Sequence, residues 1–179
     1  TNYGVTLTEV KNFEKANIFY KESIKIDPLF FEAYYNLSLN LLRSKNFQKG
    51  WEFFNYRWKA FPETFKLIKT KKPLWKDNYK EKVYIWFEQG IGDEIMFSSI
   101  LEEVIAKFDD IIVGIDKRLI PVFERSFSKR IRFINKKKLK DIYFDSHIPI
   151  GNLFKIFRID KKRFNKNPWL KSKKQINKN

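Results

Sequence analysis

A 34-residue repeat in the first third of the chain constrains its fold more than any other feature. The tripeptide Lys11-Asn12-Phe13 recurs as Lys45-Asn46-Phe47, and the same shift places Pro28 on Pro62. Further pairs at this shift are identical or similar in type: Asn2 and Asn36, Gly4 and Ser38, Leu7 and Leu41, Ala16 and Gly50, Tyr20 and Phe54. So many matches at one shift indicate two copies of one helical unit, rather than the ordinary recurrence of an apolar helix face.

The period is that of tetratricopeptide repeats, in which two antiparallel helices form each unit. Ala16 and Gly50 stand where the paired helices cross closely, and a helix is predicted from Phe47 to Phe61. Residues 1–10 align with only the later part of a first helix. We therefore expect about one and a half repeats over residues 1–65, in a chain that begins inside a longer array.

The periodicity changes after a Lys-rich connector, residues 66–82, whose Trp75 is expected to pack against the following domain. Residues 83–87 form a continuous apolar run of strand length, as a buried parallel strand requires. Further strands are predicted at 111–115, 131–134 and 142–144, and helices at 94–108, 118–127 and 152–157. This alternation predicts a Rossmann-like parallel sheet with flanking helices over residues 83–160, followed by a solvated basic tail over 161–179. The expected class is thus α followed by α/β.

The turn Glu88-Gln89-Gly90-Ile91-Gly92-Asp93 follows the first predicted strand, and loops in this position are where parallel sheets bind ligands. Gly90 and Gly92 allow a close approach of the backbone to a ligand, or a positive φ angle. The turn lacks the Gly-Lys-Ser/Thr of a P-loop, and Ile95 stands where a dinucleotide fingerprint needs a third glycine. Asp116 would suit a ribose contact, but the carboxylate of Asp93 would repel a pyrophosphate at the helix N-terminus.

Two roles for Asp93 are about equally favoured by the residues alone. An ionised carboxylate near a helix N-terminus can accept a proton from an attacking hydroxyl, as a general base does; alternatively, Asp93 is the N-cap of that helix. Glu88 and Gln89 either orient a sugar hydroxyl or end the strand. His147 would contact an acceptor or a phosphate, although a hydrogen-bonded structural role is the favoured interpretation.

Positive charge is concentrated in the last third of the chain. Of 37 Lys+Arg and 21 Asp+Glu, residues 117–179 hold 20 and 4, which accounts for the whole net charge of +16. This suits a polyanionic partner, and aromatic residues that would stack on single-stranded nucleic acid are interleaved with the basic ones: Phe123, Phe127, Phe133, Tyr143, Phe144 and Trp169. However, Lys outnumbers Arg 29 to 8, as A+T-rich coding produces, and no nucleic-acid-binding signature is present. Nucleic-acid binding is therefore the least favoured function.

Composition limits the chemistry of any site. The chain has no Cys and one His, which excludes a thiolate nucleophile and a His-rich metal centre. We accordingly predict no metal and no cofactor. No apolar run reaches the ~18 residues of a membrane-spanning helix.

Several segments resemble one group of bacterial proteins: Gly50-Trp51-Glu52 with Tyr56-Arg57-Trp58, Pro73-Leu74-Trp75, and the turn 88–93 with Phe97. The group consists of tetratricopeptide proteins fused to a glycosyltransferase domain. That domain is similar to the heptosyltransferases of glycosyltransferase family 9, whose GT-B architecture has two facing Rossmann-like halves. Residues 145–153 also resemble the closing segment of the first half.

The resemblance implies a cytoplasmic, inverting transfer of a sugar from a nucleotide-sugar donor to a hydroxyl of a protein, lipid or glycan acceptor. Asp93 is the implied base, and the predicted substrate-binding residues are Glu88, Gln89, Gly90, Gly92 and His147. The second half of a GT-B enzyme binds most of the donor, and the 26 residues after Leu153 leave no room for it. We therefore expect either a fragment of a longer enzyme, whose helical repeats bind a protein partner, or a degenerate remnant of one. The alternative is a non-catalytic tetratricopeptide interaction module.

Overall fold

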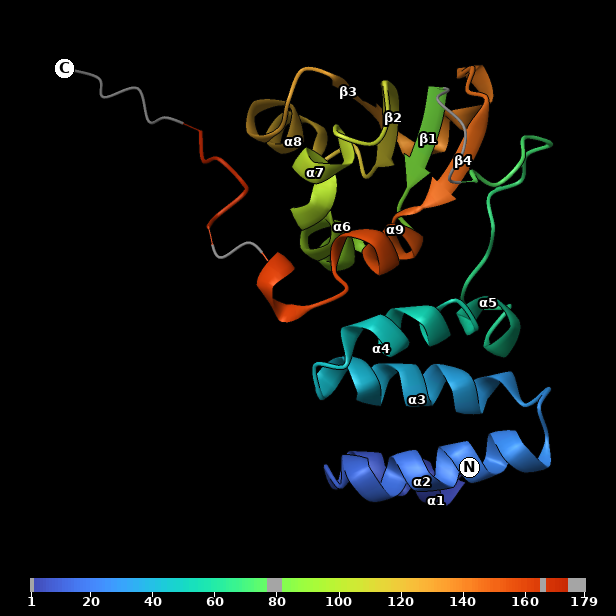
Figure 1. Ribbon diagram of the computed structural model, residues 1–179. Coiled ribbons are helices and arrows are strands. Elements are labelled where there is room, and N and C mark those ends of the chain that lie inside the picture. Colours follow the sequence, from blue (N-terminus) through green and yellow to red (C-terminus); the bar gives the residue numbers. More distant parts are fainter. Residues whose placement is uncertain (1, 77–81, 165–166, 174–179) are drawn as a thin grey trace. The chain divides into compact units, whose positions relative to one another are not determined.

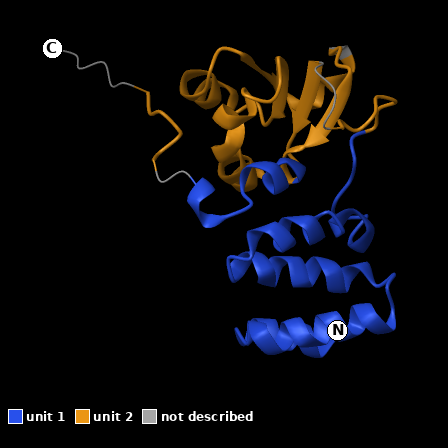
Figure 2. Cartoon of the chain, viewed as in Figure 1, with its two compact units in different colours: residues 1–68, 152–164 blue, residues 69–151, 165–179 orange. Residues whose placement is uncertain are grey.

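A computed structural model describes residues 2–76, 82–164 and 167–173 of the chain. The chain divides into two compact units (Figure 2): unit 1 comprises Thr1–Ile68 and Asn152–Phe164, and unit 2 comprises Lys69–Gly151 and Asn165–Asn179. Helices make up the described secondary structure of unit 1, whereas unit 2 combines a parallel sheet with helices (Figure 1). The expected class, α followed by α/β, is confirmed at this level.

Unit 1 begins with the antiparallel helices α1 (Asn2–Glu9), α2 (Phe13–Ile26) and α3 (Phe31–Arg43). They are followed by α4 (Phe47–Phe54) and the single turn α5 (Arg57–Ala60). The later segment of this unit contains most of α9 (Ile150–Phe157) and the 3₁₀ turn η3 (Lys161–Arg163). The predicted helix over 47–61 is thus divided in two, because α4 ends at Phe54 and α5 begins at Arg57.

The 34-residue repeat recurs in the backbone conformation. Lys11 and Lys45, one repeat apart, both adopt positive φ angles, 60° and 65°. In each turn the following asparagine donates its backbone N–H across the helix end: Asn12 to the Leu7 carbonyl at 2.8 Å, and Asn46 to the Leu41 carbonyl at 2.8 Å. The same sequence therefore ends α1 and α3 with the same turn.

Small residues lie at the helix crossings, as the repeat predicts. Ala16 is fully buried, and a Cβ atom added to Gly50 would lie 2.7 Å from the Leu42 side chain. The core of the hairpins is formed by apolar residues from α1, α2 and α3: Leu7, Ala16, Tyr20, Ala33, Leu37 and Leu41. Close packing of this kind is what a repeat needs in order to bury its apolar face against its neighbour.

Helix α9 completes unit 1 by covering α4 and α5. The Trp51 ring lies 4.8 Å from that of Phe154, and the Trp51 indole N–H donates to the Arg158 carbonyl at 3.0 Å. The buried Arg57 guanidinium donates to the Asn152 side chain at 2.7 Å. The partner of Trp51 is thus a helix that lies mostly in the same compact unit.

The described part of unit 2 contains a four-stranded parallel sheet in the order β3-β2-β1-β4. Its strands are β1 (Lys82–Trp86), β2 (Asp110–Ile115), β3 (Ile131–Asn135) and β4 (Ser146–Pro149). The connecting helices are α6 (Ile91–Phe97), η1 (Ser98–Ile100), α7 (Leu101–Val104), α8 (Ile120–Ser126) and η2 (Lys136–Asp141). Since the strand order reverses direction at β1, the loop after β1 lies where such sheets bind ligands.

Three predicted strands are confirmed, but the one at 142–144 is wrong. The fourth strand begins at Ser146. The residue before it, Asp145, donates its backbone N–H to the Lys82 carbonyl at 2.9 Å. Phe144 is buried against Tyr84, whereas Tyr143 is 65% exposed. The predicted helix over 94–108 likewise starts earlier, at Ile91, and is interrupted by η1.

Described residues of the connector and of the basic tail pack on unit 2. Trp75 stacks edge-on against Phe108, with ring centroids 4.8 Å apart, which confirms its expected packing. The tail is not wholly solvated, because the Trp169 indole donates to Ser98 Oγ at 3.0 Å and the Lys171 N–H donates to Ser126 Oγ at 2.8 Å.

Candidate functional site

The glycine turn after β1 leads directly into helix α6. Gly90 is the N-cap residue, with φ −75° and ψ 177°, so neither it nor Gly92 has the positive φ angle that was one of their predicted uses. A Cβ atom added to either glycine would meet no heavy atom of the described residues within 4 Å. Space is therefore open beside both glycines, and the remaining prediction for them is a close approach of the backbone to a ligand.

Asp93 is the third residue of α6 and is not its N-cap, so the capping interpretation is wrong. Its carboxylate lies in the first helical turn, where the helix dipole favours negative charge. The side chain is half-buried, and it makes no hydrogen bond or ion pair with the residues that the structure describes. Asp93 is therefore a carboxylate with unused hydrogen-bonding capacity at the carboxyl edge of the sheet.

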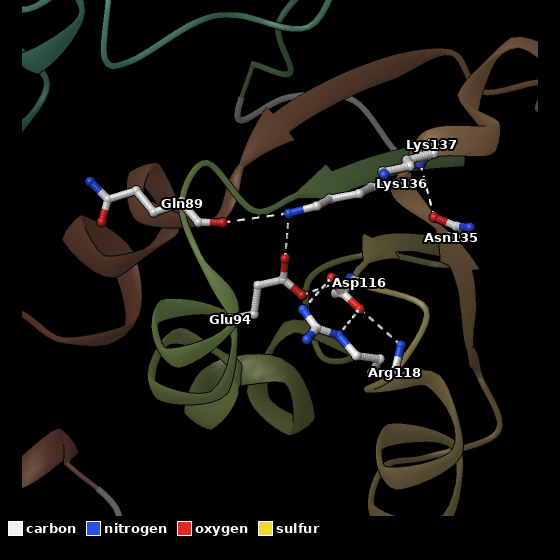
Figure 3. Close-up of polar contacts among 7 residues, drawn as sticks. All are labelled: Gln89, Glu94, Asp116, Arg118, Asn135, Lys136 and Lys137. Atoms are coloured by element: carbon white, nitrogen blue, oxygen red, sulfur yellow. Dashed lines mark hydrogen bonds and ion pairs between the residues drawn. The ribbon is translucent and has the colours of Figure 1, made fainter.

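Its neighbour Glu94 has the opposite environment (Figure 3). The side chain is fully buried, with Oε1 2.6 Å from the Lys136 ammonium and Oε2 accepting the Asp116 N–H at 2.7 Å. Lys136 also approaches the Gln89 carbonyl at 3.5 Å. One carboxylate thus ties together the segments that follow β1, β2 and β3.

Sequence reasoning missed Glu94 and Lys136. A signal existed for Glu94, because it stands three residues before Phe97 and seven before Leu101 and so lies on the same helix face as these apolar residues. A charged residue at such a position has to be paired. Nothing in the sequence identifies its partner, which is 42 residues away.

Tyr84 of β1 packs closely against Gly114 of β2, near the buried Glu94. The two residues lie on neighbouring strands, and a Cβ atom on Gly114 would overlap the Tyr84 hydroxyl. Burial, together with the nearby negative charge of Glu94, raises the pKa of the Tyr84 phenol. Tyr84 therefore stays neutral and fills space that only glycine leaves free.

Asp116, considered above for a ribose contact, is instead engaged by Arg118. The guanidinium donates to both carboxylate oxygens, at 2.9 and 3.0 Å. These hydrogen bonds hold the pKa of Asp116 well below its usual range. The carboxylate therefore remains ionised and orients Arg118 at the end of β2.

The remaining predicted residues are not drawn together into one constellation. Glu88 and Gln89 lie half-buried in the loop after β1, and the Gln89 side chain points away from Lys136 (Figure 3). His147 is only 5% exposed in β4, and its Nδ1 accepts the Trp86 indole N–H at 3.2 Å. Burial lowers the pKa of His147. This environment favours the structural interpretation of that residue.

The aromatic residues named for base stacking are mostly in the core. Phe123, Phe127 and Phe133 form a buried cluster with centroid distances of 5.2 to 6.0 Å, and Phe144 is buried as well. Only exposed rings can stack on bases. The arrangement therefore disfavours the nucleic-acid alternative.

Within the described ranges, no helix combines the length and the apolar character needed to cross a membrane. A comparison with models of known protein families finds no match. Over 86 residues the chain is 28% identical to a protein of Caulobacter vibrioides named FlbA. The match covers 45% of this chain and 14% of FlbA, so the chain is similar to a small part of that protein.

Proposed function

We propose that this chain is part of an inverting glycosyltransferase that transfers a sugar from a nucleotide-sugar donor to a hydroxyl acceptor. Unit 2 would be the first Rossmann-like half of a GT-B fold, and unit 1 would be a tetratricopeptide region that binds a protein partner. The parallel sheet, the reversal of strand order at β1 and the open glycine turn support this assignment. Because the other half of a GT-B enzyme binds most of the donor, the activity is proposed for a longer parent protein.

The contrast between Asp93 and Glu94 carries the proposal. Adjacent carboxylates in different environments take different roles: Glu94 is buried and ion-paired, whereas Asp93 is half-exposed and makes no hydrogen bond to a described residue. A general base must be able to reach the proton that it removes. Of these two carboxylates, Asp93 meets that condition.

The proposed step is a direct displacement at the sugar. Asp93 takes the proton of the acceptor hydroxyl as its oxygen bonds to the anomeric carbon. The bond from that carbon to the donor phosphate oxygen breaks on the opposite face, and the nucleotide leaves with the bonding electrons. The configuration at the anomeric carbon is thereby inverted, and Asp93 is left protonated.

Replacing Asp93 by Asn in the parent enzyme tests this role. Removing a general base lowers turnover by about 10²- to 10⁴-fold. The far-ultraviolet circular dichroism should not change and the melting temperature should change little, because Asp93 makes no hydrogen bond or ion pair with a described residue and Asn loses only the favourable interaction with the helix dipole. Asp109→Asn is the matched control, since Asp109 is exposed just before β2, at the opposite edge of the sheet. Turnover by Asp93→Asn equal to that of the control would remove Asp93 from the mechanism.

A second candidate function, binding of a protein partner without catalysis, is favoured by a hollow on unit 1. The hollow has a volume of about 430 Å³ and lies among α2, α3 and α4. It is lined by apolar, aromatic and charged residues: Lys21, Ile24, Tyr34, Leu37, Leu41, Asn46, Lys49, Glu52 and Phe53. Such a mixed surface suits a peptide segment. If this is the whole function, Tyr34→Ala should abolish partner binding while Asp93→Asn has no effect on any activity of the parent.

A further inference from the structure

The ends of β2 and β3 carry the same short motif, an Asx residue followed by two basic residues. The motif reads Asp116-Lys117-Arg118 after β2 and Asn135-Lys136-Lys137 at the end of β3. In both copies the Asx side chain accepts the backbone N–H two residues later, at 2.9 Å for Asp116 and 3.1 Å for Asn135. The two strands are parallel neighbours with Ile115 opposite Asn135, so both basic pairs reach the same edge of the sheet.

These six residues line a hollow of about 320 Å³. Its charged groups are four cations and one carboxylate. Lys136 is paired with the buried Glu94 at 2.6 Å, and Arg118 is paired with Asp116 at 2.9 Å. Lys117 and Lys137 are exposed, and within the described ranges their ammonium groups form no ion pair. Because the carboxylates of Glu94 and Asp116 neutralise two of the four cations, the hollow carries an excess of two positive charges.

We propose that this hollow binds the phosphate group of a small phosphorylated ligand. A phosphate monoester carries nearly two negative charges at neutral pH, which matches the two unpaired lysines. Arg118 adds a planar donor group that Asp116 already orients, and guanidinium groups of this kind suit phosphate oxygens. Because Asp116 stays ionised and paired, it does not present a free negative charge to the ligand.

The hollow is connected to Asp93 through one residue. Glu94 follows Asp93 in α6, and its carboxylate binds both the Lys136 ammonium and the Asp116 N–H, two groups of the hollow-lining segments. A phosphate bound here would lie at the same sheet edge as the proposed base. That the ligand is a substrate of sugar transfer depends on the proposed function; the binding of phosphate does not.

A small ligand fits these observations better than a nucleic acid. The unpaired lysines surround a single hollow, and most of the aromatic residues that would stack on bases are buried. Binding of single strands uses a track of cations with exposed rings along it. The favoured ligand is therefore compact and carries one phosphate group.

The test is an amide NMR titration of the full chain at constant ionic strength, with glucose 1-phosphate, inorganic phosphate and glucose as separate probes. Glucose 1-phosphate should shift the amides of residues 116–118 and 135–137, and glucose should not. If inorganic phosphate binds as tightly as glucose 1-phosphate, the hollow recognises the phosphate group alone. If inorganic phosphate binds more weakly, the hollow also contacts the sugar of the ester.

Charge removal decides whether the hollow itself is responsible. The double variant Lys117→Ala/Lys137→Ala should weaken binding by about tenfold or more, since each removes a charge-assisted contact. The control Lys161→Ala/Lys162→Ala removes the same charge from two exposed lysines of η3 and should bind normally. Equal weakening in both variants, or shifts spread over all basic segments, would overturn the proposal. So would binding of a single-stranded oligonucleotide without binding of either phosphate probe.

The two proposals fail separately. Asp93→Asn should bind glucose 1-phosphate as the unsubstituted chain does, because Asp93 does not line the hollow. Loss of transfer without loss of phosphate binding supports both assignments. Persistent transfer in the Lys117/Lys137 variant at unchanged substrate affinity would show that the hollow does not bind a substrate of the transfer, and would leave the role of Asp93 standing.

Discussion

The carboxylate of Glu94 and the ammonium of Lys136 lie 2.6 Å apart, although 42 residues separate them in the chain. The glutamate side chain is 1% exposed and the lysine side chain 34% exposed. The pair joins helix α6 to the end of β3, and its second carboxylate oxygen binds the backbone after β2. It therefore stabilises the carboxyl edge of the sheet, where the candidate site lies.

Breaking this pair should destabilise the fold. Lys136→Met leaves a buried negative charge without its cation, and such changes cost about 3–5 kcal/mol in free energy of unfolding. Urea denaturation measures the loss. The pair of Lys82 and Asp110, at 3.0 Å, is the control because its carboxylate is 54% exposed, and Asp110→Asn should cost no more than about 1 kcal/mol. Similar losses in the two variants would show that Glu94 is not effectively buried.

Gly114→Ala should destabilise unit 2, whereas Gly92→Ala should not. A methyl group on Gly114 would overlap the Tyr84 hydroxyl, and overpacking of this kind costs about 1–3 kcal/mol. Gly92 lies inside α6 with open space around its Cβ position, so alanine should stabilise that helix by up to about 1 kcal/mol. Thermal unfolding of the two variants compares these effects. A Gly92→Ala variant that is stable but inactive in the parent enzyme would indicate that a ligand approaches this backbone.

The buried His147 should make stability depend on pH in a defined direction. Burial lowers the pKa of His147 in the folded chain. Just below pH 6.5 the unfolded chain therefore binds a proton at this histidine, whereas the folded chain does not. Stability should therefore be constant above about pH 6.5, the usual value for histidine, and fall as the pH decreases below it. His147 is the single histidine of the chain, and most carboxylates titrate at lower pH. Chemical denaturation between pH 5 and 7.5 measures the slope.

His147→Gln is the matched variant for that experiment. It removes the titrating group but retains an acceptor for the Trp86 indole. Its stability should be lower overall and nearly independent of pH between 5.5 and 7.5, a range set by the ordinary pKa values of histidine and carboxylates. A slope equal to that of the unsubstituted chain would assign the pH dependence to another group.

The positive φ angle of Lys45 predicts that glycine stabilises unit 1 at this position. A side chain in the left-handed region costs about 1 kcal/mol, which Lys45→Gly relieves. Lys49→Gly, four residues later inside α4, should instead lower the free energy of unfolding by about 1 kcal/mol. Denaturation curves of the two variants give opposite shifts if the turn is as described. Destabilisation of equal size in both would contradict the backbone conformation of the repeat turn.

Local patterns in the sequence were sufficient for much of the fold. The recurrence of Lys-Asn-Phe predicted a repeated helical unit, and the structure shows the same turn in both copies. The apolar runs at 83–87 and 111–115 predicted two buried strands, which the structure pairs as neighbours. These features depend on residues close in the chain, through steric preference and burial on one face. The predicted turn over residues 88–93 is only partly correct, because α6 begins at Ile91 and includes Gly92 and Asp93.

Features that depend on distant pairing were beyond the sequence. The fourth strand was predicted at 142–144, but it begins at Ser146, because its start is set by pairing with β1. The last helix joined unit 1 because Asn152 and Phe154 meet Arg57 and Trp51, about a hundred residues earlier. No local pattern encodes such partners.

The same division applies to the candidate site. The sequence by itself determined that a carboxylate, Asp93, follows a glycine turn at the end of a buried strand. Only the tertiary structure decided that Glu94 is paired with Lys136 while Asp93 is not, and that two basic turns line one hollow. The physical reason is that burial and charge pairing depend on which residues become neighbours in space. These neighbours meet only when strands that are distant in the sequence lie side by side.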